Sequence, residues 1–139
     1  MEWEEIIQRS EDSFWGLLGG RVLSVSPSKV EAALTAQPKH LNSVGIVHGG
    51  VLSSLMDQVM GFAVIAAKGG LQGVTTHLNV NFLAPLGVGE LIITAYPVHE
   101  THRTMTLHAE IRNAKGELGC MATGTFRLPR STPKKQPEA

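Results

Sequence analysis

This 139-residue sequence has no pair of cysteines and no net charge, and its first residues are not basic. Because Cys120 is its one cysteine, neither a disulfide nor a cysteine zinc site can form within a single chain, and a reducing, cytoplasmic setting is expected. The 12 basic residues balance 12 acidic ones, so the broad positive surface of a nucleic-acid-binding protein is not expected. Residues 1–9 are acidic and are not expected to act as a secretory signal. Small ligands, anionic ones included, are the expected partners.

Several enzyme motifs are missing as well. The sequence has no Gly-x-Ser-x-Gly elbow, which disfavours a serine hydrolase, and neither a P-loop nor a dinucleotide-binding glycine motif. The pair His99 and His102 raises a zinc hypothesis, but strand residues three apart point to opposite faces of a sheet. No metal site is therefore expected.

A convincing membrane span is also absent. The best candidate, residues 51–67, contains two serines, a glutamine and Asp57, and its length lies at the lower limit of the roughly 17–25 residues that a span requires. A carboxylate in the middle of a bilayer is costly. A buried core helix is the better interpretation, and no membrane association is expected.

Periodicity of apolar residues predicts one helix, two strands, a long helix and four strands. The predicted ranges are a short helix within 3–18, strands at 21–26 and 29–36, a helix that starts near Gly50 and runs to 67, and strands at 74–82, 90–98, 104–111 and 118–126. In the first strand after the long helix, Val74, Thr76, Leu78, Val80 and Phe82 are expected to share one face.

This order predicts an α+β fold of the hotdog type. The long helix is apolar on most of its surface, so it needs cover on most sides, and a curved antiparallel sheet of about five to six strands provides that cover. Short connections between the last strands argue against a parallel, doubly wound sheet. Residues 1–128 are expected to form this single domain, with a short N-terminal helix, and residues 129–139 a disordered tail.

The residues with the clearest chemical meaning lie between 42 and 57. His48-Gly49-Gly50 leads into the long helix, where free backbone N–H groups at the positive end of the helix dipole can hold an oxyanion. Asp57 follows Gly50 by seven residues, or about 10.5 Å along the axis, on roughly the same face. It cannot easily act at its own helix entrance. If both groups act on one substrate, a two-fold axis must bring a second chain alongside, which predicts a homodimer with two shared active sites.

The run from Asn42 through His48-Gly49-Gly50 to Asp57, with Thr75 and the strand that ends at Pro85, resembles the PaaI-like hotdog acyl-CoA thioesterases. The resemblance covers roughly residues 18–128. It implies hydrolysis of an acyl- or aryl-CoA thioester without a metal or other cofactor. It also implies a homodimer that often pairs into a dimer of dimers, a homotetramer.

The resemblance assigns roles to individual residues. The Gly49 N–H polarises the thioester carbonyl, and the partner subunit's Asp57 acts as general base or nucleophile. Asn42 helps to hold the water or the thioester, and His48 orders the loop and the leaving-group side. Thr75 positions the water. Gly50 and Val51, together with Asn42, bind the substrate.

Two other functions stay open from the sequence. One is a non-catalytic acyl-CoA binding or sensing protein, and the other is a hotdog-fold acyl-thioester dehydratase, which needs a histidine and an acid together. An ordinary strand threonine at Thr75 and a structural aspartate at Asp57 are the corresponding non-catalytic interpretations. The acyl pocket is expected to draw in part on Val51, Leu55, Met60 and Phe62, and the candidates for phosphate binding are Lys39, Lys68, Arg103 and Arg127.

Overall fold

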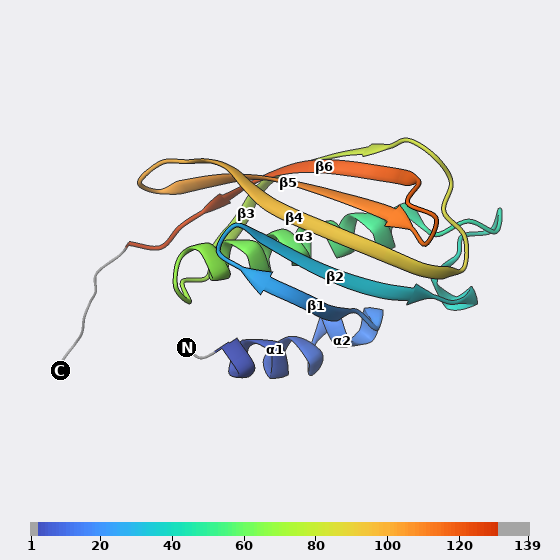
Figure 1. The fold of residues 1–139 in the computed structure, drawn as a ribbon, viewed down its shortest axis with the longest axis horizontal. Helices are drawn as coiled ribbons and strands as arrows, with labels where there is room; N and C mark the ends of the chain where they lie inside the picture. Colours follow the sequence, from blue (N-terminus) through green and yellow to red (C-terminus); the bar gives the residue numbers. More distant parts are fainter. Residues whose placement is uncertain (1–2, 131–139) are drawn as a thin grey trace.

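The fold was analysed in a computed structural model that describes residues 3–130 (Figure 1). Its elements in chain order are α1 (Trp3–Glu11), α2 (Phe14–Leu18), β1 (Arg21–Ser26), β2 (Lys29–Ala36), the 3-10 turn η1 (Pro38–His40), α3 (Gly49–Ala67), β3 (Val74–Phe82), β4 (Gly89–Glu100), β5 (Thr104–Asn113) and β6 (Leu118–Arg127). The predicted tail lies, from residue 131 onward, outside the described residues.

The six strands form one antiparallel sheet in the order β1-β2-β4-β5-β6-β3. Hairpins join β4 to β5 and β5 to β6, as the short connections predicted. The chain leaves α3 and enters the sheet at its far edge, so β3 has β6 as its neighbour on one side and no strand from residues 3–130 on the other. The strand that follows the long helix is therefore an edge strand.

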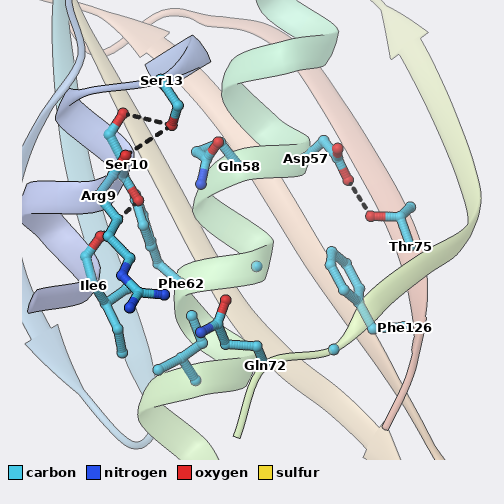
Figure 2. Close-up of a pocket in the computed structure, with 13 residues that line it drawn as sticks. Ile6, Arg9, Ser10, Ser13, Asp57, Gln58, Phe62, Gln72, Thr75 and Phe126 are labelled. Atoms are coloured by element: carbon cyan, nitrogen blue, oxygen red, sulfur yellow. Dashed lines mark hydrogen bonds between the residues drawn. The ribbon is translucent and has the colours of Figure 1, made fainter. Parts of the chain in front are cut away.

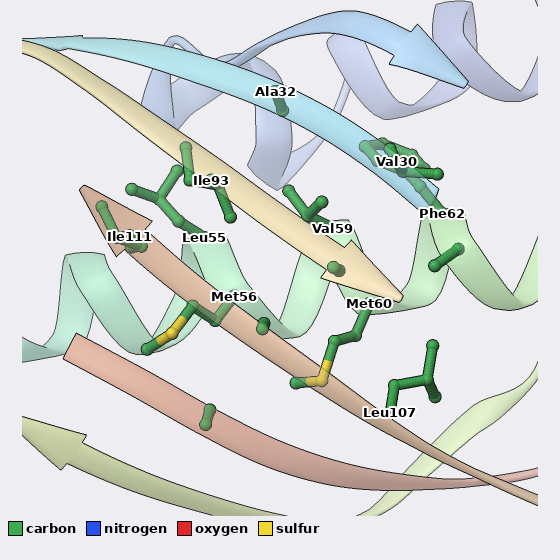
Figure 3. Close-up of a cluster of buried hydrophobic side chains, with 14 of the residues drawn as sticks. Val30, Ala32, Leu55, Met56, Val59, Met60, Phe62, Ile93, Leu107 and Ile111 are labelled. Atoms are coloured by element: carbon green, nitrogen blue, oxygen red, sulfur yellow. The ribbon is translucent and has the colours of Figure 1, made fainter. Parts of the chain in front are cut away.

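Helix α3 lies along the inner face of the curved sheet (Figure 1). Its side chains Leu55, Met56 and Met60 point toward strands β4 and β5, where Ile93 and Ile111 meet them (Figure 3). Removing a side chain of this size from water contributes roughly 1.5–3 kcal/mol of stability. Although α3 is long and apolar enough to cross a membrane, half of that stretch is buried in the domain. The arrangement is the predicted hotdog fold.

The N-terminal segment differs from the prediction, because it forms two helices instead of one. Ser13 lies between α1 and α2, and its Oγ donates to the carbonyl oxygens of Arg9 at 2.9 Å and Ser10 at 3.1 Å. A serine side chain that satisfies these carbonyls competes with continuation of the helix. Both helices pack on α3 through Phe62, whose ring makes edge contacts with Trp3 and Trp15.

Strand β3 also differs, because its alternation is interrupted near its start. Its pairing with β6 shifts between Thr75 and His77, so one extra residue bulges there. Before the bulge Val74 is 68% exposed, and at the other end of the strand Phe82 is 57% exposed, while Leu78 is partly buried. The expectation that all five residues share one face was wrong, because the bulge exchanges the two faces of the strand and so separates Val74 from Leu78, Val80 and Phe82.

Candidate active site

Asp57 and Thr75 form a hydrogen-bonded pair. Thr75 Oγ1 donates to Asp57 Oδ1 at 2.7 Å, and both side chains are partly buried (Figure 2). The β3 bulge explains this pairing, since it turns Thr75 toward the same side as Leu78 and so toward α3. A carboxylate has room for about four acceptor contacts, so Asp57 can accept from a water while Thr75 holds it.

A cavity of about 320 Å³ opens beside this pair. Helix α3 forms one wall with Asp57, Gln58, Gly61, Phe62 and Ile65, and α1 and the residues after it form the opposite wall with Ile6, Arg9, Ser10 and Ser13 (Figure 2). The cavity is completed by Gln72, Gly73, Thr75 and Phe126. A methyl group added at Gly61 would extend into this cavity and lie 3.7 Å from Phe126, which is an ordinary van der Waals distance. The absence of a side chain at Gly61 therefore leaves space between α3 and Phe126.

The entrance of α3 is capped by His48. Its Nδ1 accepts from the Gly50 N–H at 2.8 Å, and its backbone carbonyl accepts from the N–H groups of Val51 and Leu52. A ring nitrogen that accepts carries no proton, so the proton of this imidazole lies on Nε2. The Gly50 N–H is therefore satisfied within the chain. The Gly49 N–H has no acceptor among residues 3–130, as is usual for the first residue of a helix.

Gly49 lies in a second cavity, of about 410 Å³, together with Asn42 and the end of β3. The ring of Phe82 covers Gly49 closely, since a Cβ at this position would lie 3.1 Å from Phe82 Cζ. Asn42 Oδ1 accepts from the N–H groups of Val44 at 3.0 Å and Ile46 at 3.3 Å and so holds the loop before the helix. The Nδ2 amide of Asn42 is the part of that side chain left for a ligand.

Within one chain, the acid and the free amide are not brought together. Asp57 lies eight residues after Gly49, which corresponds to about 12 Å along the axis of α3. The cavity beside Asp57 and the cavity beside Gly49 have no lining residue in common. Each cavity therefore holds one half of the predicted site: Asp57 and Thr75 in one, Gly49 and Asn42 in the other.

Other predicted residues lie elsewhere. Val51 lines neither cavity, Leu55 and Met60 are fully buried in the core, and Phe62 alone of the expected acyl-pocket residues lines the Asp57 cavity. Of the basic candidates, Lys68 is paired with Glu100, and Arg103 Nε donates to the Leu128 carbonyl at 3.2 Å. No group of three or more potential metal ligands occurs in the described part of the chain.

Three residues near the site were missed by the sequence analysis: Arg9, Gln58 and Phe82. Gln58 directly follows Asp57, so its position on the helix could have indicated it. Phe82 was expected only to share the apolar face of its strand, and its contact with Gly49 appears only in the structure. Arg9 comes from α1, and nothing in its local sequence indicates contact with the Asp57 cavity.

Comparison with known proteins connects this geometry to a family. The sequence model of the thioesterase superfamily matches residues 44–120, a range that includes Gly49, Asp57 and Thr75. Human acyl-coenzyme A thioesterase 13 is 27% identical over 109 residues, which are 77% of this chain and 78% of the human protein.

Solved structures agree with this result. A conserved protein from Pseudomonas aeruginosa is 30% identical, with a TM-score of 0.80 over 84% of this chain and 94% of that one. A Streptococcus mutans protein that was solved with acetyl CoA bound is 26% identical, with a TM-score of 0.76 over 80% of this chain and 89% of that one. The predicted resemblance and the predicted fold are thus confirmed.

Proposed function

This chain belongs to the thioesterase superfamily, and we propose that it hydrolyses acyl- or aryl-CoA thioesters in active sites shared between two subunits. The observation that carries the proposal is the position of the two half-sites along β3. Thr75, near the start of the strand, holds Asp57, whereas Phe82, at its end, covers Gly49. The acid and the amide therefore lie at opposite ends of one edge strand.

A two-fold axis beside β3 would unite these halves. Antiparallel pairing of β3 with a second copy sets the start of one strand against the end of the other, and so sets the partner subunit's Asp57 beside Gly49. The free edge of β3 supports this pairing, because its nine residues include no lysine, arginine, acid or proline, the residues that usually protect an edge strand. We extend the proposal to a pair of such dimers in a cytoplasmic setting.

The chemistry follows from the groups present. In the proposed site the Gly49 N–H donates to the thioester oxygen as attack makes it negative, which favours the transition state over the ground state. The partner subunit's Asp57, oriented by its threonine, accepts a proton from the attacking water or attacks the carbonyl directly. Asn42 contributes its Nδ2 amide to the substrate, and His48 keeps the helix entrance ordered. Coenzyme A thiolate leaves readily, so no cofactor is needed.

The decisive experiment replaces Asp57 by asparagine, which keeps the shape of the side chain and removes its basicity. We expect kcat for free-thiol release from acyl-CoA to fall by roughly 10²–10⁴. Binding of a non-hydrolysable acyl-CoA thioether, measured by calorimetry, should persist. The matched control is Asp12→Asn, at the other aspartate of the sequence, which is exposed on the surface and accepts from Gln8 Nε2.

The outcomes separate the functions. Hydrolysis by the Asp57→Asn protein at a rate close to wild type, across aliphatic and aryl thioesters, would show that the assigned base is wrong. Tight binding of these thioesters by the wild-type protein without any release of thiol would instead identify an acyl-CoA binding or sensing protein.

A further inference from the structure

A second groove adjoins the cavity beside Asp57, under α1. This groove has a volume of about 300 Å³ and is lined by Trp3, Ile6, Val25, Ser26, Pro27, Ile65, Ala66, Gly69 and Gly70. Ile6 of α1 and Ile65 of α3 belong to the walls of both spaces. They are almost fully buried, so together they form the boundary between the Asp57 cavity and this groove.

One face of α3 runs along both spaces. Ala66, near the end of α3, and Gly69, in the turn after it, line the groove. Asp57, Gly61 and Ile65 follow each other at intervals of four residues. Residues spaced in this way lie above one another on a helix. Figure 2 shows α1, with Ile6 and Arg9, opposite α3 across the Asp57 cavity. Since Ile6 also lines the groove, a ligand that extends from Asp57 along α3 toward the groove runs between α1 and α3.

The two spaces differ in chemistry. The Asp57 cavity is lined in part by the polar residues Arg9, Gln58 and Gln72. The groove has no charged lining residue, and Ser26 is the lining residue that carries a hydroxyl. A polar first segment followed by an apolar second one fits a thioester whose carbonyl end is polar and whose far end is hydrocarbon. An apolar cavity of about 150 Å³ is enough to hold benzene, so this groove is large enough for several methylene groups.

We propose that the groove under α1 binds the far end of a linear acyl chain, so that α1 determines the acyl-chain length this protein prefers. This inference rests on the proposed thioesterase function and names its substrate class. From Asp57 to Ile65 the axis of α3 advances about 12 Å over eight residues. An extended alkyl chain advances roughly 1.3 Å per carbon, given a C–C bond of about 1.5 Å. Chains of about nine carbons or more therefore reach the groove, and shorter chains and aryl groups stop before it.

The test fills the groove without touching the Asp57 cavity. Ala66→Phe places a ring in the groove from α3, and Ala114→Phe, in the exposed turn between β5 and β6, is the matched control. The probes are butanoyl-, hexanoyl-, decanoyl- and dodecanoyl-CoA, with kcat/KM measured by free-thiol release. Hydrophobic pockets discriminate one methylene by roughly 10- to 200-fold. We expect Ala66→Phe to lose at least about tenfold on dodecanoyl-CoA and to change less than about twofold on butanoyl-CoA.

A second variant keeps the proposal falsifiable if Ala66→Phe does not fold. Val25→Phe fills the groove from β1, at a residue that is already 38% exposed, and should produce the same selective loss. Parallel chain-length profiles for a folded groove variant and wild type would overturn the proposal. Binding of non-hydrolysable thioether analogues of the same lengths gives an independent readout. If wild type hydrolyses none of the probes, the proposed function fails, while a loss of long-chain analogue binding in the variants would still support the groove.

Discussion

The Gly49 N–H can be removed by a single substitution that the local backbone accepts, namely Gly49→Pro. Proline has no N–H, and the first position of a helix is where it is tolerated best. The preceding residue, His48, has φ −60° and ψ 134°, which is the region that a residue before proline adopts. The substitution therefore removes one donor and leaves the start of α3 in place.

The expected loss follows from the role of that donor. Removing one oxyanion donor costs roughly 10²–10³ in kcat. The change in KM should be small, because the neutral carbonyl of the bound substrate attracts the donor less than the developing oxyanion does. The Gly50 N–H cannot take over, since it already donates to His48 Nδ1. The whole loss should therefore appear in the chemical step.

Gly49→Ala is the matched control for this prediction. It adds a Cβ 3.1 Å from Phe82 Cζ, as proline does, but it keeps the N–H. Because Phe82 is more than half exposed, its ring can shift by the few tenths of an ångström required. Steady-state free-thiol release with both variants, after thermal melts confirm folding, decides the matter. If Gly49→Pro stays within threefold of Gly49→Ala, the backbone amide is not the oxyanion donor.

Three further outcomes are expected. Thr75→Val removes the hydroxyl that orients Asp57 and should lower kcat by roughly 10- to 100-fold, the equivalent of one hydrogen bond to a charged group; unchanged kcat would contradict this role. Gly119→Ala drives a Cβ into the buried side chain of Leu86, so the free energy of unfolding in urea should fall by about 1–3 kcal/mol; an equally stable variant would contradict this packing. Burial raises the pKa of Cys120 from 9.0 to about 11, so the folded protein should resist alkylation at pH 8. Since the unfolded thiol ionises first, stability should also fall between pH 9 and about pH 11, which denaturation at each pH measures.

The elements with regular periodicity could be predicted from the sequence. In β5 the alternating residues Met105, Leu107, Ala109 and Ile111 are all buried, as their spacing predicted. Helix α3 begins at Gly49, one residue before the expected start. These features depend on the spacing of apolar residues along one buried face, and that spacing can be read from the sequence.

Features that depend on distant contacts could not be predicted in this way. The bulge in β3 depends on how that strand pairs with β6, and it exposes Val74 while it turns Thr75 toward Asp57. Likewise, the break between α1 and α2 depends on Ser13, whose hydroxyl competes with helix continuation. The sequence indicated which residues could react, but their division between two cavities appears only when the whole sheet is built.

Mixed dimers test the sharing of the active sites most directly. Heterodimers of an Asp57→Asn chain and a Gly49→Pro chain, purified through two different tags, contain one site with both groups intact if the sites are shared. They should regain roughly half of the wild-type activity, because one of two symmetric sites is restored. Heterodimers of wild type with the Asp57→Asn, Gly49→Pro double variant should be nearly inactive, since each site then lacks one group. The reverse pattern, an inactive first heterodimer and a half-active second one, would place both groups of each site in a single subunit and contradict the shared site.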